Sequence, residues 1–168
     1  VVTLEDLIDP DAFNMGIEEF FQVCDSTGAE PVFVVNFSFA RYGPSADRVA
    51  QAAGYAANWV RHVNNNLGRY VRYWEIGNEN YGPWQAGYMV EGEQITGTMY
   101  GEMFRVFADS MKSVDPSIEL GAVIYPLDEE YNDWTSQVLP QVQNDADFLI
   151  VHDYFACLLY TSDAADEA

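Results

Sequence analysis

The sequence predicts an α/β fold built on a parallel β-sheet, and three features support this prediction. From residue 12 onward, segments with apolar residues at helical spacing alternate with β-prone segments. The β-prone segments are largely apolar on both faces, which is typical of strands covered on both sides. Their carboxyl ends carry polar residues. Two architectures fit, a closed eight-stranded barrel and an open doubly wound sheet; no Gly-x-Gly-x-x-Gly motif follows a strand, which weakens the dinucleotide-binding form of the second.

The first part of the chain predicts two helices and one strand. Apolar residues recur at the spacing of an amphipathic helix over 16–28. The β-branched and aromatic run over 32–39 predicts the first strand. Ser45 and Asp47 are residue types that begin helices, and the long helix they open is expected to end before Gly68.

The second part of the chain predicts three further strands separated by two helices. The strands are expected over 70–77, 118–125 and 146–155. The helices are expected over 100–114 and 134–143. The four strand segments share no repeated sequence, so their spacing indicates successive βα units and not a solenoid.

Charge and composition restrict the partners of the protein. The 168 residues include 27 acidic and 7 basic ones, for a formal charge of −20. This excess argues against nucleic acid and anionic membranes as partners, whereas neutral substrates fit. No window has the 18 apolar residues of a membrane span, and the chain starts without Met or a basic leader, so its localisation stays open between intracellular and secreted.

The last residues predict a non-native tail. The segment 157–167, CLLYTSDAADE, matches one reading frame of a transposase adapter used in preparing DNA sequencing libraries. We therefore expect a partial barrel domain over 1–156 and an adapter-derived tail over 157–168.

Polar residues follow three of the expected strands and form the candidate site. Asn36 lies toward the carboxyl end of the first strand, Asn78 and Glu79 follow the second, and His152 and Tyr154 lie at the end of the fourth. In a parallel barrel these ends meet at one mouth, where reactive groups collect. Each residue also has a simpler interpretation, as a solvated carboxylate, a core histidine or a strand-end amide.

Strand alternation sets a condition on this site. It places Glu75 and Glu79 on one side of the strand and Asn78 on the other. If both Asn78 and Glu79 contact one ligand, the chain must leave strand geometry at Gly77, where glycine permits it. Glu75 is expected to be a structural carboxylate paired with an arginine such as Arg72 or Arg69.

Three motifs resemble a known family. They are Gly-Asn-Glu at 77–79, Gly-Pro-Trp-Gln at 82–85 and His-x-Tyr at 152–154. In this order and at these distances they resemble the α-L-arabinofuranosidases of glycoside hydrolase family 51, in the clan of retaining glycosidases built on (β/α)8 barrels. Nearly the whole chain up to Ala156 takes part. The resemblance implies a partial (β/α)8 TIM barrel, with about strands three to six and their helices.

The resemblance also implies roles for the site residues. Glu79 would be the general acid/base, and the substrate-binding residues would be Asn36, Asn78, Trp84, His152 and Tyr154. Retaining glycosidases pair the acid/base with a carboxylate nucleophile about 5–5.5 Å away. In the family that nucleophile is a Glu on the seventh strand, which lies outside this chain, so the chain alone is expected to be inactive.

The role of general acid requires a particular environment around Glu79. This residue must be protonated near neutral pH, so its pKa must be raised by a desolvated site and nearby negative charge. Trp74, Tyr81 and Trp84 are candidates for an apolar wall; Tyr81 and Trp84 could equally serve loop packing. No cofactor is expected, and no metal site either, because His62 has no Cys or His at ligand spacing.

The implied function is hydrolysis of terminal arabinofuranosyl linkages in plant polysaccharides or oligosaccharides, with a carbohydrate as partner. Alternatives are another glycosidase of the clan, such as a β-xylosidase or endoglucanase, and a non-catalytic carbohydrate-binding barrel. The stretch between Tyr88 and Tyr100 is longer than in the family and leaves specificity open. The oligomeric state also stays open.

Overall fold

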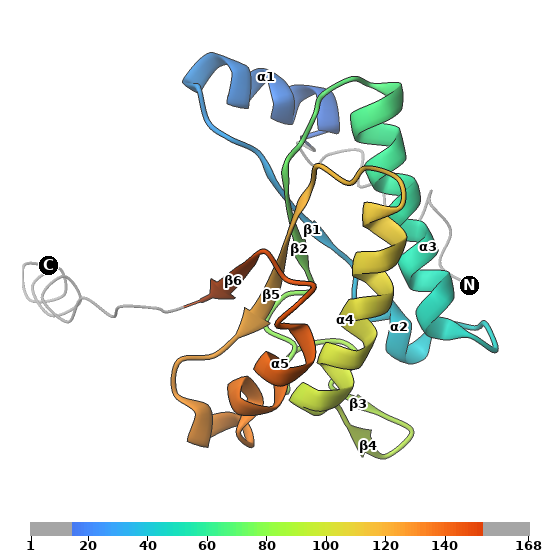
Figure 1. Ribbon diagram of the computed structural model, residues 1–168, viewed down its shortest axis with the longest axis vertical. Coiled ribbons are helices and arrows are strands. Elements are labelled where there is room, and N and C mark those ends of the chain that lie inside the picture. Colours follow the sequence, from blue (N-terminus) through green and yellow to red (C-terminus); the bar gives the residue numbers. More distant parts are fainter. Residues whose placement is uncertain (1–14, 153–168) are drawn as a thin grey trace, which may run out of the picture. The chain divides into compact units, whose positions relative to one another are not determined.

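A computed structural model describes residues 15–152 of the chain (Figure 1). The chain divides into two compact units, residues 1–31 and 32–168. In the first unit the described residues form one helix, α1 (Ile17–Thr27), as predicted. Gly28 ends it in the left-handed conformation, at φ 69°. The expected tail over 157–168 and Tyr154 lie outside the described residues.

The second unit contains a four-stranded parallel sheet in the order β1-β2-β5-β6. Its strands are β1 (Val32–Val35), β2 (Tyr73–Ile76), β5 (Glu119–Ile124) and β6 (Phe148–Val151). One row across the sheet consists of Val34, Glu75, Gly121 and Phe148. The parallel sheet confirms the predicted α/β class.

Helices connect the strands and cover one face of the sheet (Figure 1). They are α2 (Phe39–Tyr42), α3 (Arg48–Val60) with a π-helical continuation (Arg61–Asn66), α4 (Gly97–Lys112), a 3₁₀ turn (Asp128–Tyr131) and α5 (Trp134–Val142). Neighbouring helices pack in the order α3, α4, α5. Asp47 caps α3 by accepting from Ala50 N at 3.0 Å, as its residue type predicts.

A small antiparallel hairpin of β3 (Met89–Val90) and β4 (Glu93–Gln94) stands apart from the sheet. It lies in the stretch between Tyr88 and Tyr100 that the sequence marked as unusually long.

The core lies between the sheet and its covering helices. Trp74, Ile76, Leu120 and Ala122 of β2 and β5 are all fully buried there. The hydroxyl of Tyr100 in α4 donates to Ile76 O at 2.7 Å and accepts from Val123 N at 2.9 Å. This side chain therefore ties the carboxyl end of β2 to β5, and burial raises the pKa of its phenol far above the usual range.

The expected strand boundaries were too wide. The first strand was expected over 32–39 but ends at Val35. Phe37 N bonds to Val35 O at 2.8 Å and the Asn36 side chain accepts from Phe39 N at 3.3 Å, so the chain turns into α2 instead. The second strand begins at Tyr73 rather than 70, and α4 begins three residues earlier than expected, after the cap at Thr96.

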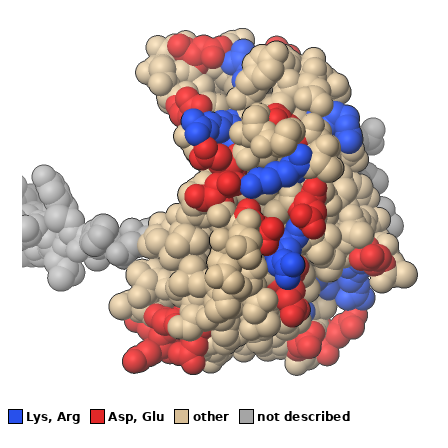
Figure 2. Space-filling model, in the orientation of Figure 1, with Lys and Arg blue, Asp and Glu red and all other residues tan. Residues whose placement is uncertain are grey.

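Basic side chains on the face shown in Figure 2 lie among acidic ones. Ion pairs join Arg48 to Glu91, Arg72 to Glu119, Arg105 to Asp145 and Lys112 to Asp147. Each of these pairs is at least partly exposed to solvent, and ion pairs of this kind contribute little to stability. No described helix is long and apolar enough to span a membrane.

Candidate active site

The carboxyl end of β2 turns sharply and brings Glu79 inward. Gly77 has φ 93° and Glu79 has φ 45°, which is rare for a residue with a side chain. The prediction that the chain leaves strand geometry at Gly77 is therefore confirmed. Such strain in a non-glycine residue costs about 1–3 kcal/mol and is typical of functional sites.

Both carboxyl oxygens of Glu79 have partners. The residue is 8 % exposed. Its Oε2 accepts a hydrogen bond from Trp84 Nε1 at 2.8 Å, and its Oε1 lies 3.0 Å from His152 Nδ1. The structure thus brings together three of the residues that the sequence singled out.

These two partners differ in what they can do. The indole of Trp84 can only donate, so Oε2 must be an acceptor. The imidazole of His152 donates to a carboxylate in one tautomer and accepts from a carboxylic acid in the other. The contact at Oε1 is therefore compatible with both protonation states of Glu79, as an acid/base requires.

Asn78 and Asn36 are exposed and border a small hollow of about 180 Å³ at the ends of β1 and β2. Gln85 also lines it. The hollow adjoins the turn that carries Glu79, and its amide groups can both donate and accept hydrogen bonds. It is the described hollow that best fits a polar ligand next to Glu79.

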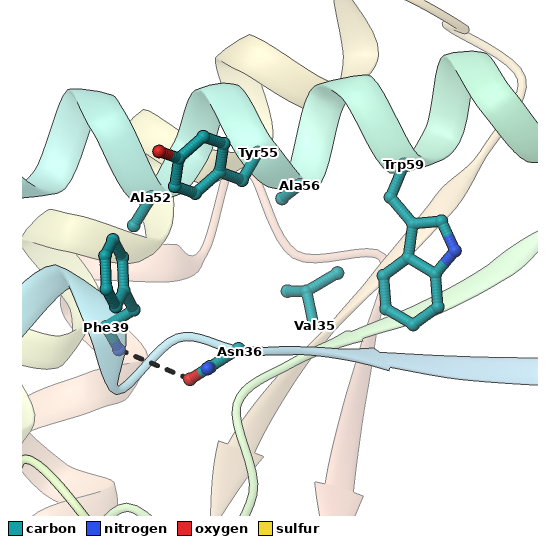
Figure 3. Close-up of a pocket in the computed structure, with 7 residues that line it drawn as sticks. All are labelled: Val35, Asn36, Phe39, Ala52, Tyr55, Ala56 and Trp59. Carbon is teal, nitrogen blue, oxygen red and sulfur yellow. Dashed lines mark hydrogen bonds between the residues drawn. The ribbon is translucent and has the colours of Figure 1, made fainter. Parts of the chain in front are cut away.

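A second cavity, of about 230 Å³, lies between β1 and α3 (Figure 3). Its lining is mostly apolar and consists of Val35, Asn36, Phe39, Ala52, Tyr55, Ala56 and Trp59. No residue of the turn that carries Glu79 lines it, whereas Gly77 and Asn78 of that turn line the smaller hollow. In Figure 3 the Asn36 side chain turns back toward the Phe39 amide rather than into the cavity. We therefore do not place the chemistry there.

The aromatic residues divide into packing and exposed groups. Tyr81 is 3 % exposed and packs against Tyr125, Tyr131 and Trp134, which decides in favour of loop packing for this residue. Trp84 is 56 % exposed, with the Tyr131 ring edge-on at 6.0 Å.

Trp74 does not belong to the predicted apolar wall. It lies on the helix side of the sheet, against Phe33 and Trp59, and its indole donates to Val71 O. Side chains alternate between the two faces of the sheet along β2. Trp74 therefore points to the helix side, although it is close to Glu79 in sequence.

Glu75 lies behind the site and is half-buried. Burial raises the pKa of its carboxyl, and the nearby His152 opposes this shift. The expected pair with Arg72 is wrong, because Arg72 pairs with Glu119 on the neighbouring strand. Glu75 thus contributes negative charge near His152.

Within residues 15–152, no group of three His, Cys, Asp or Glu side chains is arranged to hold a metal ion. His62 lies in the π-helical continuation of α3.

Sequence reasoning missed three residues around the site. Tyr131 reaches it from the 3₁₀ turn after β5, Gln85 lines the hollow, and Arg41 holds the hairpin. Gln85 is the last residue of the Gly-Pro-Trp-Gln motif at 82–85, so the sequence contained a pattern from which it could have been predicted. The other two depend on contacts that no local pattern reveals.

A parallel βα array whose strand ends carry a buried carboxyl, an imidazole and amide side chains fits part of a (β/α)8 barrel with a site at its carboxyl-end face. The chain belongs to the family described as alpha-L-arabinofuranosidase 1 domain, whose model matches residues 5–157.

Characterised and solved proteins agree with this placement. The chain is 31 % identical over 111 residues to the probable alpha-L-arabinofuranosidase C of Aspergillus flavus, covering 64 % of this chain and 21 % of that protein. It is 26 % identical over 149 residues to an intracellular exo-alpha-(1->5)-L-arabinofuranosidase of Acetivibrio thermocellus, covering 84 % of this chain and 28 % of that protein.

Among solved structures, it superimposes on an alpha-L-arabinofuranosidase from Thermotoga maritima, in complex with arabinose, with a TM-score of 0.60 at 27 % identity, covering 82 % of this chain and 27 % of the other. A family 51 alpha-L-arabinofuranosidase from Bifidobacterium longum, at 22 % identity and a TM-score of 0.63, covers 92 % of this chain and 30 % of that one and supports the fold. The chain therefore spans between about a fifth and a third of the length of these relatives.

Proposed function

We propose that the full-length protein containing this chain is a retaining glycoside hydrolase of the α-L-arabinofuranosidase type, with Glu79 as the general acid/base. The observation that carries the proposal is the buried Glu79 carboxyl, bonded to a fixed donor on one oxygen and an adaptable imidazole on the other. The names of the relatives supply the sugar, an arabinofuranosyl group, and the exo action named for the Acetivibrio thermocellus relative supports cleavage at a chain end.

The chemistry follows from this arrangement. Cleavage of a glycosidic bond passes through an oxocarbenium-like state, in which the leaving oxygen must gain a proton. Glu79 gives its proton to that oxygen and then takes one from the attacking water. The amides of Asn36 and Asn78 border the hollow beside it and are suited to hydrogen-bond sugar hydroxyls without adding charge. The nucleophile is proposed to lie outside this chain.

Glu79→Ala in the full-length enzyme tests the acid role. Hydrolysis of arabinofuranosides with poor leaving groups should fall by about 10²–10⁴-fold, the usual contribution of acid catalysis. Activated aryl arabinofuranosides leave without protonation, so their bond cleavage should fall much less. Added azide should restore turnover on the aryl substrates, because it attacks the glycosyl-enzyme without needing a base.

Glu102→Gln is the control, because it removes an exposed carboxyl in α4, away from the strand ends. It should show no such dependence on the leaving group. Equal losses on both substrate classes for Glu79→Ala, or a leaving-group dependence for Glu102→Gln, would remove Glu79 from the acid role.

A further inference from the structure

Arg41 anchors the hairpin β3–β4 and the turn before it, although it lies in α2 and outside the site described above. It is 6 % exposed. Its Nε donates to Gly87 O at 3.2 Å, its Nη2 donates to Glu93 O at 2.7 Å, and its Nη1 lies 3.3 Å from the Glu93 carboxylate. Two of these three contacts are to backbone carbonyls, so the guanidinium fixes the path of the main chain.

The main chain at Gly87 is directly connected to the turn that carries Trp84. Gln85 N bonds to Gly82 O, and Tyr88 N bonds to Gln85 O, both at 3.1 Å. Gly87 has φ 86°, and a Cβ there would lie 3.1 Å from a backbone oxygen at the start of α2. The turn is therefore pressed against α2 only three residues beyond Trp84.

Trp84 depends on this turn for its position. Its side chain is 56 % exposed, so burial fixes the ring only weakly. Nevertheless its indole donates to Glu79 Oε2 at 2.8 Å. The ring lies directly over Gly82 of the same turn, where an added Cβ would be 2.3 Å from it, so the position of the indole follows the path of this turn.

We propose that Arg41 is a positioning residue for the acid/base: by holding the turn 82–88 it keeps the Trp84 indole hydrogen-bonded to Glu79. The inference rests on the proposed function of Glu79. Arginine is required because its planar fork reaches two carbonyls at once, whereas a lysine ammonium at the same place reaches fewer of these acceptors. The Glu93 carboxylate is exposed and contributes little.

The test compares Arg41→Lys, Trp84→Phe and their double variant in the full-length enzyme, with Glu93→Gln as the control. Glu93→Gln removes the ion pair but keeps the backbone carbonyl. Trp84→Phe should lower kcat on poor leaving groups by about 10- to 100-fold, the equivalent of one hydrogen bond to a charged group. Arg41→Lys should lower it by about tenfold, and Glu93→Gln by less than about twofold.

The double variant decides whether Arg41 acts through Trp84. If it does, Arg41→Lys adds less than about a further twofold loss in the Trp84→Phe background. An additive loss, or wild-type kcat for Arg41→Lys, would overturn the proposal. A loss in Glu93→Gln equal to that in Arg41→Lys would do the same, because it would assign the effect to the ion pair.

A spectroscopic measurement separates failure of this proposal from failure of the proposed function. In protein labelled with 5-fluorotryptophan, Arg41→Lys should shift the fluorine signal of Trp84, assigned by its loss in Trp84→Phe. The signals of the buried Trp74 and Trp134 should stay unchanged. An unmoved Trp84 signal overturns the proposal even if the enzyme has another activity.

A second variant keeps the test valid if Arg41→Lys does not fold. Replacing residues 90–93 with Asn-Gly leaves Met89 paired with Gln94 across a two-residue turn. Arg41 then loses both contacts to Glu93 but stays in place. The Trp84 signal should shift here too, and its constancy would equally refute the role of the hairpin contacts.

Discussion

The two faces of the sheet differ in how completely they are covered. On the face that meets α3, α4 and α5, Trp74 and Leu120 are fully buried. On the opposite face, Val32 and Val34 are both 42 % exposed. Glu79 and its imidazole partner belong to the strand ends that border this open face. In a (β/α)8 barrel the corresponding face is packed inside the barrel.

This difference in burial between the two faces shows that the described residues form a complete core on the helix-covered face only. The helix-covered core is a finished layer, apart from the edge strand β6, where Leu149 and Val151 are each 47 % exposed. We expect the open face to be covered by the remaining strands in the full-length protein. Side chains on the helix-covered face are thus expected to stabilise this chain by itself. Side chains on the open face are expected to contribute to stability only when further strands close the barrel.

The largest expected change in the free energy of unfolding comes from replacing Trp74 on the helix-covered face. Trp74→Ala should lower the free energy of unfolding of the full-length protein by about 3–5 kcal/mol, because it empties a packed core position. Urea unfolding gives the value. The same substitution should be equally harmful whether or not the barrel is closed.

Val34→Ala is the matched substitution on the open face. If further strands cover it, its cost in the full-length protein should reach about 1–2 kcal/mol, the scale of a buried aliphatic side chain. A cost within about 0.5 kcal/mol, as for a surface position, would show that this face stays open in the full-length protein.

The next prediction concerns Gly77, which follows β2 and ends the alternation of its side chains between the two faces of the sheet. A Cβ there would lie 2.1 Å from Asn80 Oδ1, at a φ of 93°. Gly77→Ala should therefore cost about 1–3 kcal/mol from backbone strain, with the clash in addition. It should also displace Glu79, so kcat should fall with the same dependence on the leaving group as in Glu79→Ala.

Gly54→Ala is the control for this substitution. Gly54 lies in α3 with nothing within 4 Å of an added Cβ. Alanine favours a helix over glycine by about 0.5–1 kcal/mol, so this variant should be slightly more stable and fully active. If both glycine variants behaved alike, the strained turn at Gly77 would not be needed for the site.

The sequence predicted those features that depend on local pattern. The alternation of helices and strands, the departure at Gly77 and the N-cap at Asp47 all follow from residues within a few positions of one another. The extent of the first strand was wrong because the β-prone Phe37 and Phe39 follow Asn36, whose side chain stabilises a turn.

The remaining features depend on contacts distant in sequence. Arg41 meets its hairpin partners 46 and 52 residues further along the chain. Glu119, which lies 47 residues from Arg72, pairs with the arginine that was expected to pair with Glu75. Such pairings are decided by sheet register and packing, which no local window contains.

The smallest expected effect is a change in the pH dependence of unfolding, caused by the carboxyl of Glu75 behind the site. Burial raises the pKa of this carboxyl above its ordinary value of 4.5, although His152 opposes the shift. The folded protein therefore binds the proton more tightly than the unfolded chain. Stability is lost as pH rises from the unfolded value through the folded one. Glu75→Gln should flatten this slope and make the protein slightly more stable at neutral pH.

Glu102→Gln provides the control, because it removes an exposed carboxyl from α4 and leaves the carboxyl behind the site in place. Closing the barrel buries Glu75 further, so its effect should be larger in the full-length protein than in this chain. A profile for Glu75→Gln that coincides with wild type would mean that water reaches this carboxyl freely, and that the open face carries no desolvated charge behind Glu79.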